Sequence, residues 1–222
     1  MTITFLGTSA ANAYPLAYCR CDNCERAREL GGPSLRRRSS VLVNDDLLID
    51  LGPDIITGSF LAGCSLANVR YCLQTHSHSD HLDPAHFEPR TPEWGVVDVP
   101  RLHFYASPAT ARRAAEHSEG FYDSGDILDP KVSERLDLEI HQLEALQTLA
   151  IGRYEVTAFA ANHDPAVDPV MSRNSSVPES ALKALSRTTD HCTRPQMICD
   201  VVRPRNVRIV FFGGIGAGHR LI

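Results

Sequence analysis

Short apolar segments alternate with polar turns along most of the chain, and their pattern predicts a fold rich in β-strands. Residues 136–143 alternate apolar and polar side chains with a period of two, as expected for a half-buried strand. Residues 41–43 and 47–52 flank the polar turn Asn44-Asp45-Asp46 and predict a β-hairpin. Further strands are predicted at residues 2–7, in the run that begins at Tyr71, at 102–106, 154–161 and 207–212, with a connector or short strand at 148–151.

Helix signals lie between these strands. A short helix is predicted to begin near Cys24, with Asp22 or Asn23 as its cap, and the run Gly31-Gly32-Pro33 would end it. Residues 53–61 are mildly helical. Ser107 and Pro108 are residue types that favour the N-cap and the first position of a helix, and an alanine-rich segment follows them. Strands and short helices are therefore both expected in the N-terminal part of the chain.

Four metal-binding side chains follow the strand that begins at Tyr71. His76, His78, Asp80 and His81 lie within six residues. Crowding imidazoles and a carboxylate is costly, through desolvation and through repulsion between protonated rings, and a divalent metal relieves both costs. Imidazole nitrogens and carboxylate oxygens suit zinc and similar ions. The spacing favours a two-metal site over a single tetrahedral ion; the alternative is a histidine-rich surface loop without metal.

A second cluster consists of Cys19, Cys21 and Cys24 in the spacing C-x-C-x-x-C. Three thiolates so close together are typical of a structural zinc site, with one further ligand from elsewhere in the chain. The alternative is three reduced, buried cysteines without metal.

Composition limits the function further. The chain has 222 residues, which suits a single domain over residues 1–222. The net charge of −5 argues against bulk electrostatic binding of nucleic acid. The N-terminus reads as a strand and lacks the basic start of a signal peptide, and no apolar run approaches the roughly 18–20 residues of a membrane span. With seven cysteines, an odd number, these features predict a reducing, cytoplasmic location without membrane association. These features do not decide the oligomeric state, and a homodimer is one of the alternatives.

Several motifs together resemble one family. The His76-to-His81 motif resembles the signature of the metallo-β-lactamase fold superfamily. A wider set of motifs accompanies it: Phe5-Leu-Gly-Thr-Ser, the cysteine cluster with Ala27-Arg28, Arg37-Arg38-Ser39-Ser40, Leu48-Ile-Asp50-Leu-Gly52-Pro-Asp and Thr75-His-Ser-His-Ser-Asp-His. Together these motifs resemble the branch that contains the phosphoribosyl cyclic phosphodiesterase of phosphonate breakdown, over roughly residues 1–168. This resemblance implies an α+β fold, the αββα four-layer sandwich, incomplete here at the C-terminus.

The resemblance also implies roles for individual residues. His76, His78 and His163 would hold one metal, while Asp80 and His81 would begin the second site. His163 also fits on its own, because it follows a predicted strand. Asp50 would lie beside the metal site and orient the metal ligands by contacting them. The alternative is that Asp50 only caps a turn. Asp80 is the candidate catalytic carboxylate, and a late histidine would complete the structural zinc site.

The implied reaction is metal-assisted hydrolysis of a phosphodiester, with a small cyclic or nucleotide-like phosphate ester as substrate. Coordination to metal lowers the pKa of water toward about 7, which provides a hydroxide nucleophile at neutral pH. The implied cofactor is Zn²⁺, with Mn²⁺ as an alternative: two ions at a complete active site and one structural ion. The competing functions are a metal-dependent ribonuclease and a metal-binding remnant without catalytic activity.

The C-terminal part departs from the resembled pattern. A complete two-metal site in this superfamily needs an Asp that bridges the metals after the His163 position, and a later His. Asp190 and Asp200 are poor candidates for the bridging Asp, and no apolar strand precedes Asp190. His219 follows a strand, but it resembles a position upstream of the expected final His. Residues 170–222 are therefore expected to be divergent, frame-shifted or truncated. Translation of the coding DNA in all three frames tests this.

Overall fold

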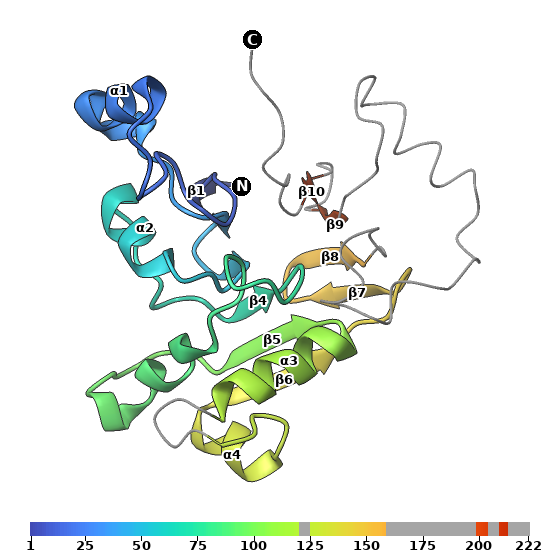
Figure 1. The fold of residues 1–222 in the computed structure, drawn as a ribbon. Coiled ribbons are helices and arrows are strands. Elements are labelled where there is room, and N and C mark those ends of the chain that lie inside the picture. Colours follow the sequence, from blue (N-terminus) through green and yellow to red (C-terminus); the bar gives the residue numbers. More distant parts are fainter. Residues whose placement is uncertain (120–124, 159–198, 204–208, 213–222) are drawn as a thin grey trace.

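A computed structural model of the chain describes residues 1–119 and 125–158, together with the backbone of two strands at 199–203 and 209–212 (Figure 1). The larger of two sheets has the strand order β1-β2-β3-β4-β5-β6. Strands β1 to β3 are antiparallel, and β3 to β6 run parallel to one another. The strands are β1 (Ile3–Gly7), β2 (Ser40–Val43), β3 (Leu47–Ile49), β4 (Tyr71–Leu73), β5 (Leu102–Ala106) and β6 (Leu138–Gln142).

The second sheet is antiparallel and has the order β10-β9-β8-β7. Its strands are β7 (Thr148–Ile151), β8 (Tyr154–Thr157), β9 (Cys199–Arg203) and β10 (Ile209–Phe212). Strands far apart in the sequence are thus neighbours here, because Val156 of β8 lies opposite Val202 of β9.

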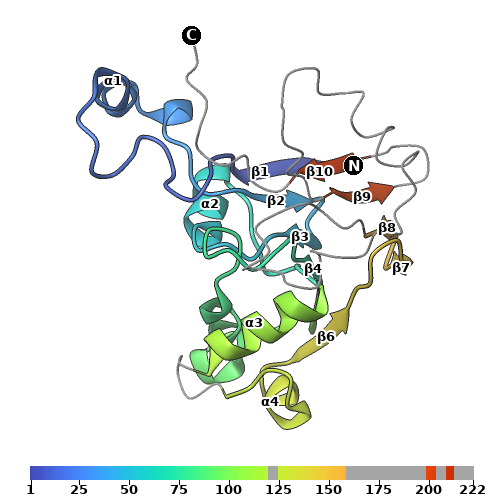
Figure 2. The same cartoon turned by 45° about the vertical axis from the view of Figure 1, so that its right-hand side comes forward.

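Four helices and four short 3-10 turns complete the described elements. The helices are α1 (Asp22–Leu30), α2 (Ile55–Ala62), α3 (Pro108–Ser118) and α4 (Pro130–Arg135). The 3-10 turns are Gly32–Ser34, Pro84–His86, Glu88–Arg90 and Pro92–Trp94. Figure 2 shows α1 standing away from the sheets, whereas α2 and α3 lie close to the larger sheet. Within the described part of the chain, every helix is too short or too polar to cross a membrane.

Two apolar cores arrange these elements in layers. On one face of the larger sheet, Phe104 and Ala106 pack with Ala111 and Ala114 of α3. On the other face the core contains residues of both sheets, among them Val43, Leu73, Ile151 and Val156. The described residues therefore form three layers, one of helices and two of sheet. The short strands β3 and β4 are buried on both faces, as their continuous apolar runs require.

The predicted α+β class is confirmed, and the predicted strands and helices occur close to their predicted positions. The hairpin forms between β2 and β3, and the Ser107 hydroxyl caps α3 by accepting a hydrogen bond from the amide of Thr110. Two elements were missed, α4 and β9. Strand β9 lies within a stretch that shows no clear periodicity, and α4 is only six residues long. Strand β8 ends at Thr157, and residues 159–161 of the predicted 154–161 strand lie outside the described residues.

Gly7 provides a test of the packing at β1. A Cβ atom built there would lie 1.8 Å from the carbonyl oxygen of Arg38 and 2.8 Å from that of Arg37. Both contacts are with backbone atoms, so the backbone must shift to accommodate Gly7→Ala. We therefore expect this variant to lower the free energy of unfolding by about 1–3 kcal/mol or more. Urea denaturation measures this. Thr8→Ala, at the exposed neighbouring residue, is the control and should cost far less; equal costs would contradict the prediction.

Candidate metal centre

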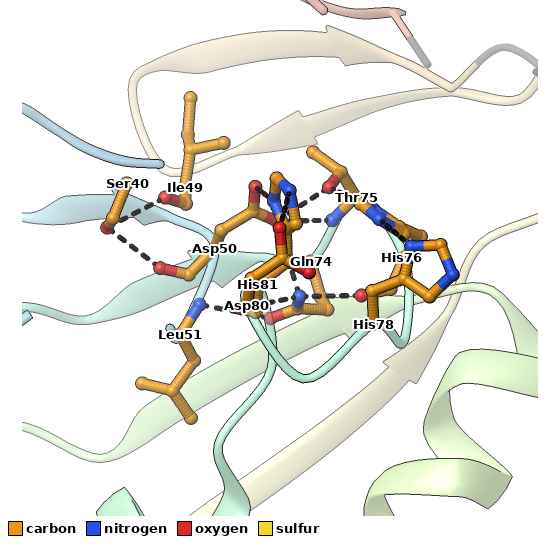
Figure 3. Close-up of polar contacts among 10 residues, drawn as sticks. All are labelled: Ser40, Ile49, Asp50, Leu51, Gln74, Thr75, His76, His78, Asp80 and His81. Atoms are coloured by element: carbon orange, nitrogen blue, oxygen red, sulfur yellow. Dashed lines mark hydrogen bonds and ion pairs between the residues drawn. The ribbon is translucent and has the colours of Figure 1, made fainter. Parts of the chain in front are cut away.

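The histidine motif lies on the loop that leaves the carboxyl end of β4 (Figure 3). Neighbouring parallel strands end at the same edge, so Asp50 after β3 and Gln74 after β4 lie together. The amide of Gln74 donates to the carbonyl of Tyr105 at 2.8 Å, which fixes the start of the loop against β5. The whole motif therefore starts at the carboxyl edge of the parallel strands β3, β4 and β5.

Gln74 holds the loop closed. Its side-chain amide donates to the carbonyl oxygens of His76 (2.8 Å) and His81 (3.0 Å). Its Oε1 accepts from the amide of Leu51 at 3.1 Å. Because Gln74 is buried, these bonds are shielded from water and link both ends of the motif to the turn after β3. This residue was not predicted from the sequence; the available signal was an uncharged polar side chain directly after a buried apolar strand.

Asp50 orients His81. Its backbone has a positive φ of 65°, a conformation that Asp and Asn tolerate better than most residues. One carboxylate oxygen accepts from the amide of Thr75 (2.9 Å) and its hydroxyl (2.7 Å). The other lies 2.6 Å from Nδ1 of His81. This bond places the proton of a neutral His81 ring on Nδ1, so Nε2 is the free ligand atom.

The charge of Asp50 also acts on the titration of His81. Burial disfavours the imidazolium form, but the charge of Asp50, its hydrogen bond and the nearby Asp80 outweigh burial and raise the pKa of His81. Asp50 thus contacts a histidine of the motif directly, and its role in orienting metal ligands stays a prediction.

The four motif side chains form two pairs of ligand atoms. Nε2 of His76 lies 3.0 Å from Nδ1 of His78, and the hydroxyl of Thr75 lies 2.9 Å from Nδ1 of His76. Nε2 of His81 lies 3.4 Å from Oδ2 of Asp80. Two ligands of a tetrahedral zinc ion, each about 2.0–2.1 Å from the metal, are about 3.3 Å apart. Both pairs therefore have a spacing that suits metal ligands.

One atom in this cluster tests whether a metal fits. Nε2 of His81 is buried and makes no hydrogen bond within the described part of the chain. An unsatisfied buried polar atom costs about 1–3 kcal/mol, and coordination of a cation would remove that cost. The donor set and this atom together fit a divalent ion.

The structure describes neither His163 nor most of the poorly matching residues of the C-terminal part. His163 lies outside the described residues, as do Asp190 and His219. Asp200 lies in β9. The assignment of His163 to the first metal therefore stays a prediction.

The three cysteines meet at the N-terminus of α1, where Cys21 is the N-cap residue and Cys24 lies in the first turn. The Sγ atoms of Cys19, Cys21 and Cys24 all lie within 4.8 Å of one another, and Cys24 is buried. A backbone hydrogen bond at Cys24 and contacts with the other two thiols lower the pKa of Cys21, whereas burial raises the pKa of Cys24. The cluster has the donor type and spacing of a structural zinc site that needs one more ligand.

Cys24→Ser tests the structural zinc. We expect the variant to lose about one tightly bound zinc ion per chain, because a serine hydroxyl is a poor zinc ligand. Mass spectrometry of the metal content measures this. Cys64→Ser, which removes a thiol outside the cluster, is the control and should keep the full content. An unchanged zinc content in Cys24→Ser would mean that the three cysteines are reduced thiols that bind no metal.

Comparison with solved structures identifies the fold of the chain. No protein-family model and no curated protein matches the sequence. Zn²⁺-bound PqqB from Methylobacterium extorquens superposes with a TM-score of 0.62 at 16% identity, covering 96% of this chain and 63% of PqqB. Human tRNase Z, short form, gives 0.55 at 16%, covering 97% and 70%. A diphosphatase from the PhnP family gives 0.53 at 20%, covering 70% and 55%.

These similarities establish that the chain has the metallo-β-lactamase fold, as the motifs indicated. The chain spans less than two thirds of the length of PqqB and of the diphosphatase.

Proposed function

We propose that the chain is a metal-dependent hydrolase that cleaves a small cyclic or nucleotide-like phosphodiester. The observation that carries the proposal is the His81 arrangement, in which Asp50 fixes Nδ1 and leaves Nε2 buried beside Asp80 without a hydrogen-bond partner among the described residues. Such a ligand atom, preoriented and unsatisfied, suits a metal site. PqqB, which shares this fold, binds Zn²⁺ in its crystal structure, and this supports zinc as the first ion to test.

Each side chain has a task in this proposal. His76 and His78 would hold one ion through Nε2 and Nδ1, with His163 as their predicted third partner. Asp80 and His81 would hold the other. Divalent ions at this edge would supply a hydroxide nucleophile at neutral pH and stabilise charge on the phosphoryl oxygens. The Asp80 carboxylate is the group placed to accept or return a proton.

Two rival functions remain to be tested. The similarity to tRNase Z over 97% of this chain favours a ribonuclease, whereas the net charge of −5 argues against an RNA substrate. A metal-binding remnant without activity is favoured by the departure of residues 170–222 from the family pattern.

One set of assays separates the three functions. The zinc- or manganese-loaded chain is incubated with bis(p-nitrophenyl) phosphate, with a ribose cyclic phosphate, and with RNA analysed on a gel. Hydrolysis of the small esters without cleavage of RNA supports the proposal. Cleavage of RNA would establish the ribonuclease, and bound metal without turnover of any substrate would establish the remnant.

A further inference from the structure

A third group of side chains that could hold a metal ion lies on the larger sheet and includes no residue of the two sequence motifs. His103 belongs to β5, while Glu139 and His141 belong to β6. In the parallel pairing His103 lies opposite Glu139, and Tyr105 lies opposite His141. Since alternate residues of a strand share a face, all of these side chains project from the same side of the sheet. It is the side that packs on the second sheet, because Tyr105 belongs to that core.

The ligand atoms of this group already have the spacing of a metal site. Nδ1 of His103 lies 3.1 Å from Nε2 of His141. Oε2 of Glu139 lies 3.4 Å from Nδ1 of His103, and its Oε1 lies 3.5 Å from Nε2 of His141. Tetrahedral zinc ligands are about 3.3 Å apart. A hydrogen bond between the rings and ion pairs with Glu139 account for these distances, and all three also suit the ligands of one shared ion.

Stacked rings hold the two histidines in place. The His141 ring stacks on Tyr105 at 4.4 Å with an angle of 11° between the planes. His103 stacks on His141 at 5.3 Å and lies against Tyr71 at 5.7 Å. This packing lowers the entropy cost of fixing the ligands, because their rings are ordered before an ion binds.

The group is also open to an incoming ion. About a third of each histidine side chain (30%) and about half of Glu139 (48%) is exposed to solvent. Among the described residues, the ion pairs of Glu139 run only to these two histidines, so no Lys or Arg there competes for its charge.

We propose that His103, Glu139 and His141 form a further binding site for a zinc-class divalent ion, separate from the motif after β4 and from the cysteines. Two imidazole nitrogens and a carboxylate suit Zn²⁺, Cu²⁺ or Ni²⁺, and the fourth position is left to water. The ion joins β5 to β6, the strand at the end of the described sheet. It therefore stabilises the folded chain in proportion to its occupancy.

Counting ions in three variants of the full chain tests the proposal. His141→Phe keeps an aromatic ring on Tyr105 but removes the ligand nitrogen, and Glu139→Gln removes the carboxylate. Each should bind about one zinc ion fewer than the wild type, because three protein ligands are the usual minimum for such a site. His117→Phe, at a histidine of α3 outside the group, is the matched control and should bind the wild-type number. A wild-type ion count in both site variants would overturn the site.

A measurement on the unchanged protein covers the case in which a variant fails to fold. Zinc is added to the metal-stripped wild-type chain, and the ring nitrogens of its histidines are followed by NMR. Binding should shift Nδ1 of His103 and Nε2 of His141 together, with saturation at one ion for the pair. If both nitrogens keep their metal-free shifts while the other sites fill, the group is a hydrogen-bonded cluster and the proposal is wrong.

Discussion

Replacing His78 with alanine is expected to lower the hydrolysis of bis(p-nitrophenyl) phosphate by more than about 100-fold. Loss of a residue that merely orients a metal ligand typically costs about 10–100-fold, and loss of the ligand itself should cost more. His78 contributes one of the two paired nitrogens at the carboxyl edge of β4. A steady-state assay of the metal-loaded variant measures the effect.

His117→Ala is the matched control for His78→Ala, because it removes an imidazole from α3 rather than from the loop. It should hydrolyse the ester at the wild-type rate. Far-ultraviolet circular dichroism shows whether each variant is folded. A folded His78→Ala variant that retains wild-type turnover would refute the assigned site.

Asp50→Asn is expected to weaken metal binding by about 10–100-fold, the usual cost of losing a partner that orients a ligand. Asparagine tolerates the positive φ of 65° at this position, so the backbone can stay in place. What is lost is the negative charge 2.6 Å from Nδ1 of His81. Competition with a chelator measures the affinity. Asp83→Asn, on the same loop but at the start of a 3-10 turn, is the control.

The same variant has a signature in the pH dependence of stability of the metal-free chain. Asp50 contributes to a raised pKa of His81. A raised folded-state pKa gives stability that is complete below the unfolded value of about 6.5 and is lost as the pH rises through the folded-state pKa. Urea denaturation across this range should show that loss in the wild type and a smaller one in Asp50→Asn. Identical pH profiles would mean that the Asp50–His81 interaction does not contribute.

Local patterns explain which parts of the molecule the sequence predicts well. The β2–β3 hairpin, the Ser107 cap and the His76-to-His81 motif each depend on residues close together in the chain, so their spacing alone carries the signal. The segment of α4 has a capping signal too, since the Asp129 carboxylate accepts from the amide of Lys131, but it is too short for a periodic pattern.

The features that the sequence did not predict depend on contacts between residues far apart in the chain. Gln74 acquires its role only when β3 and β5 lie on either side of β4, and nothing in its local sequence specifies the carbonyls that it reaches. His103 and His141 are 38 residues apart and meet only through the parallel pairing of β5 and β6. On its own strand, His141 appears as an ordinary residue in an alternating pattern.

In the proposed function, the loop after β4 would hold the ions on which hydrolysis depends. The most direct test strips the chain of metal, adds zinc or manganese back stepwise, and records bound ions and turnover of bis(p-nitrophenyl) phosphate together. We expect turnover to be lost in the stripped chain, to return as metal binds, and not to return in His78→Ala. Full turnover in the stripped wild-type chain would contradict this expectation, as would a fully loaded wild-type chain without any turnover.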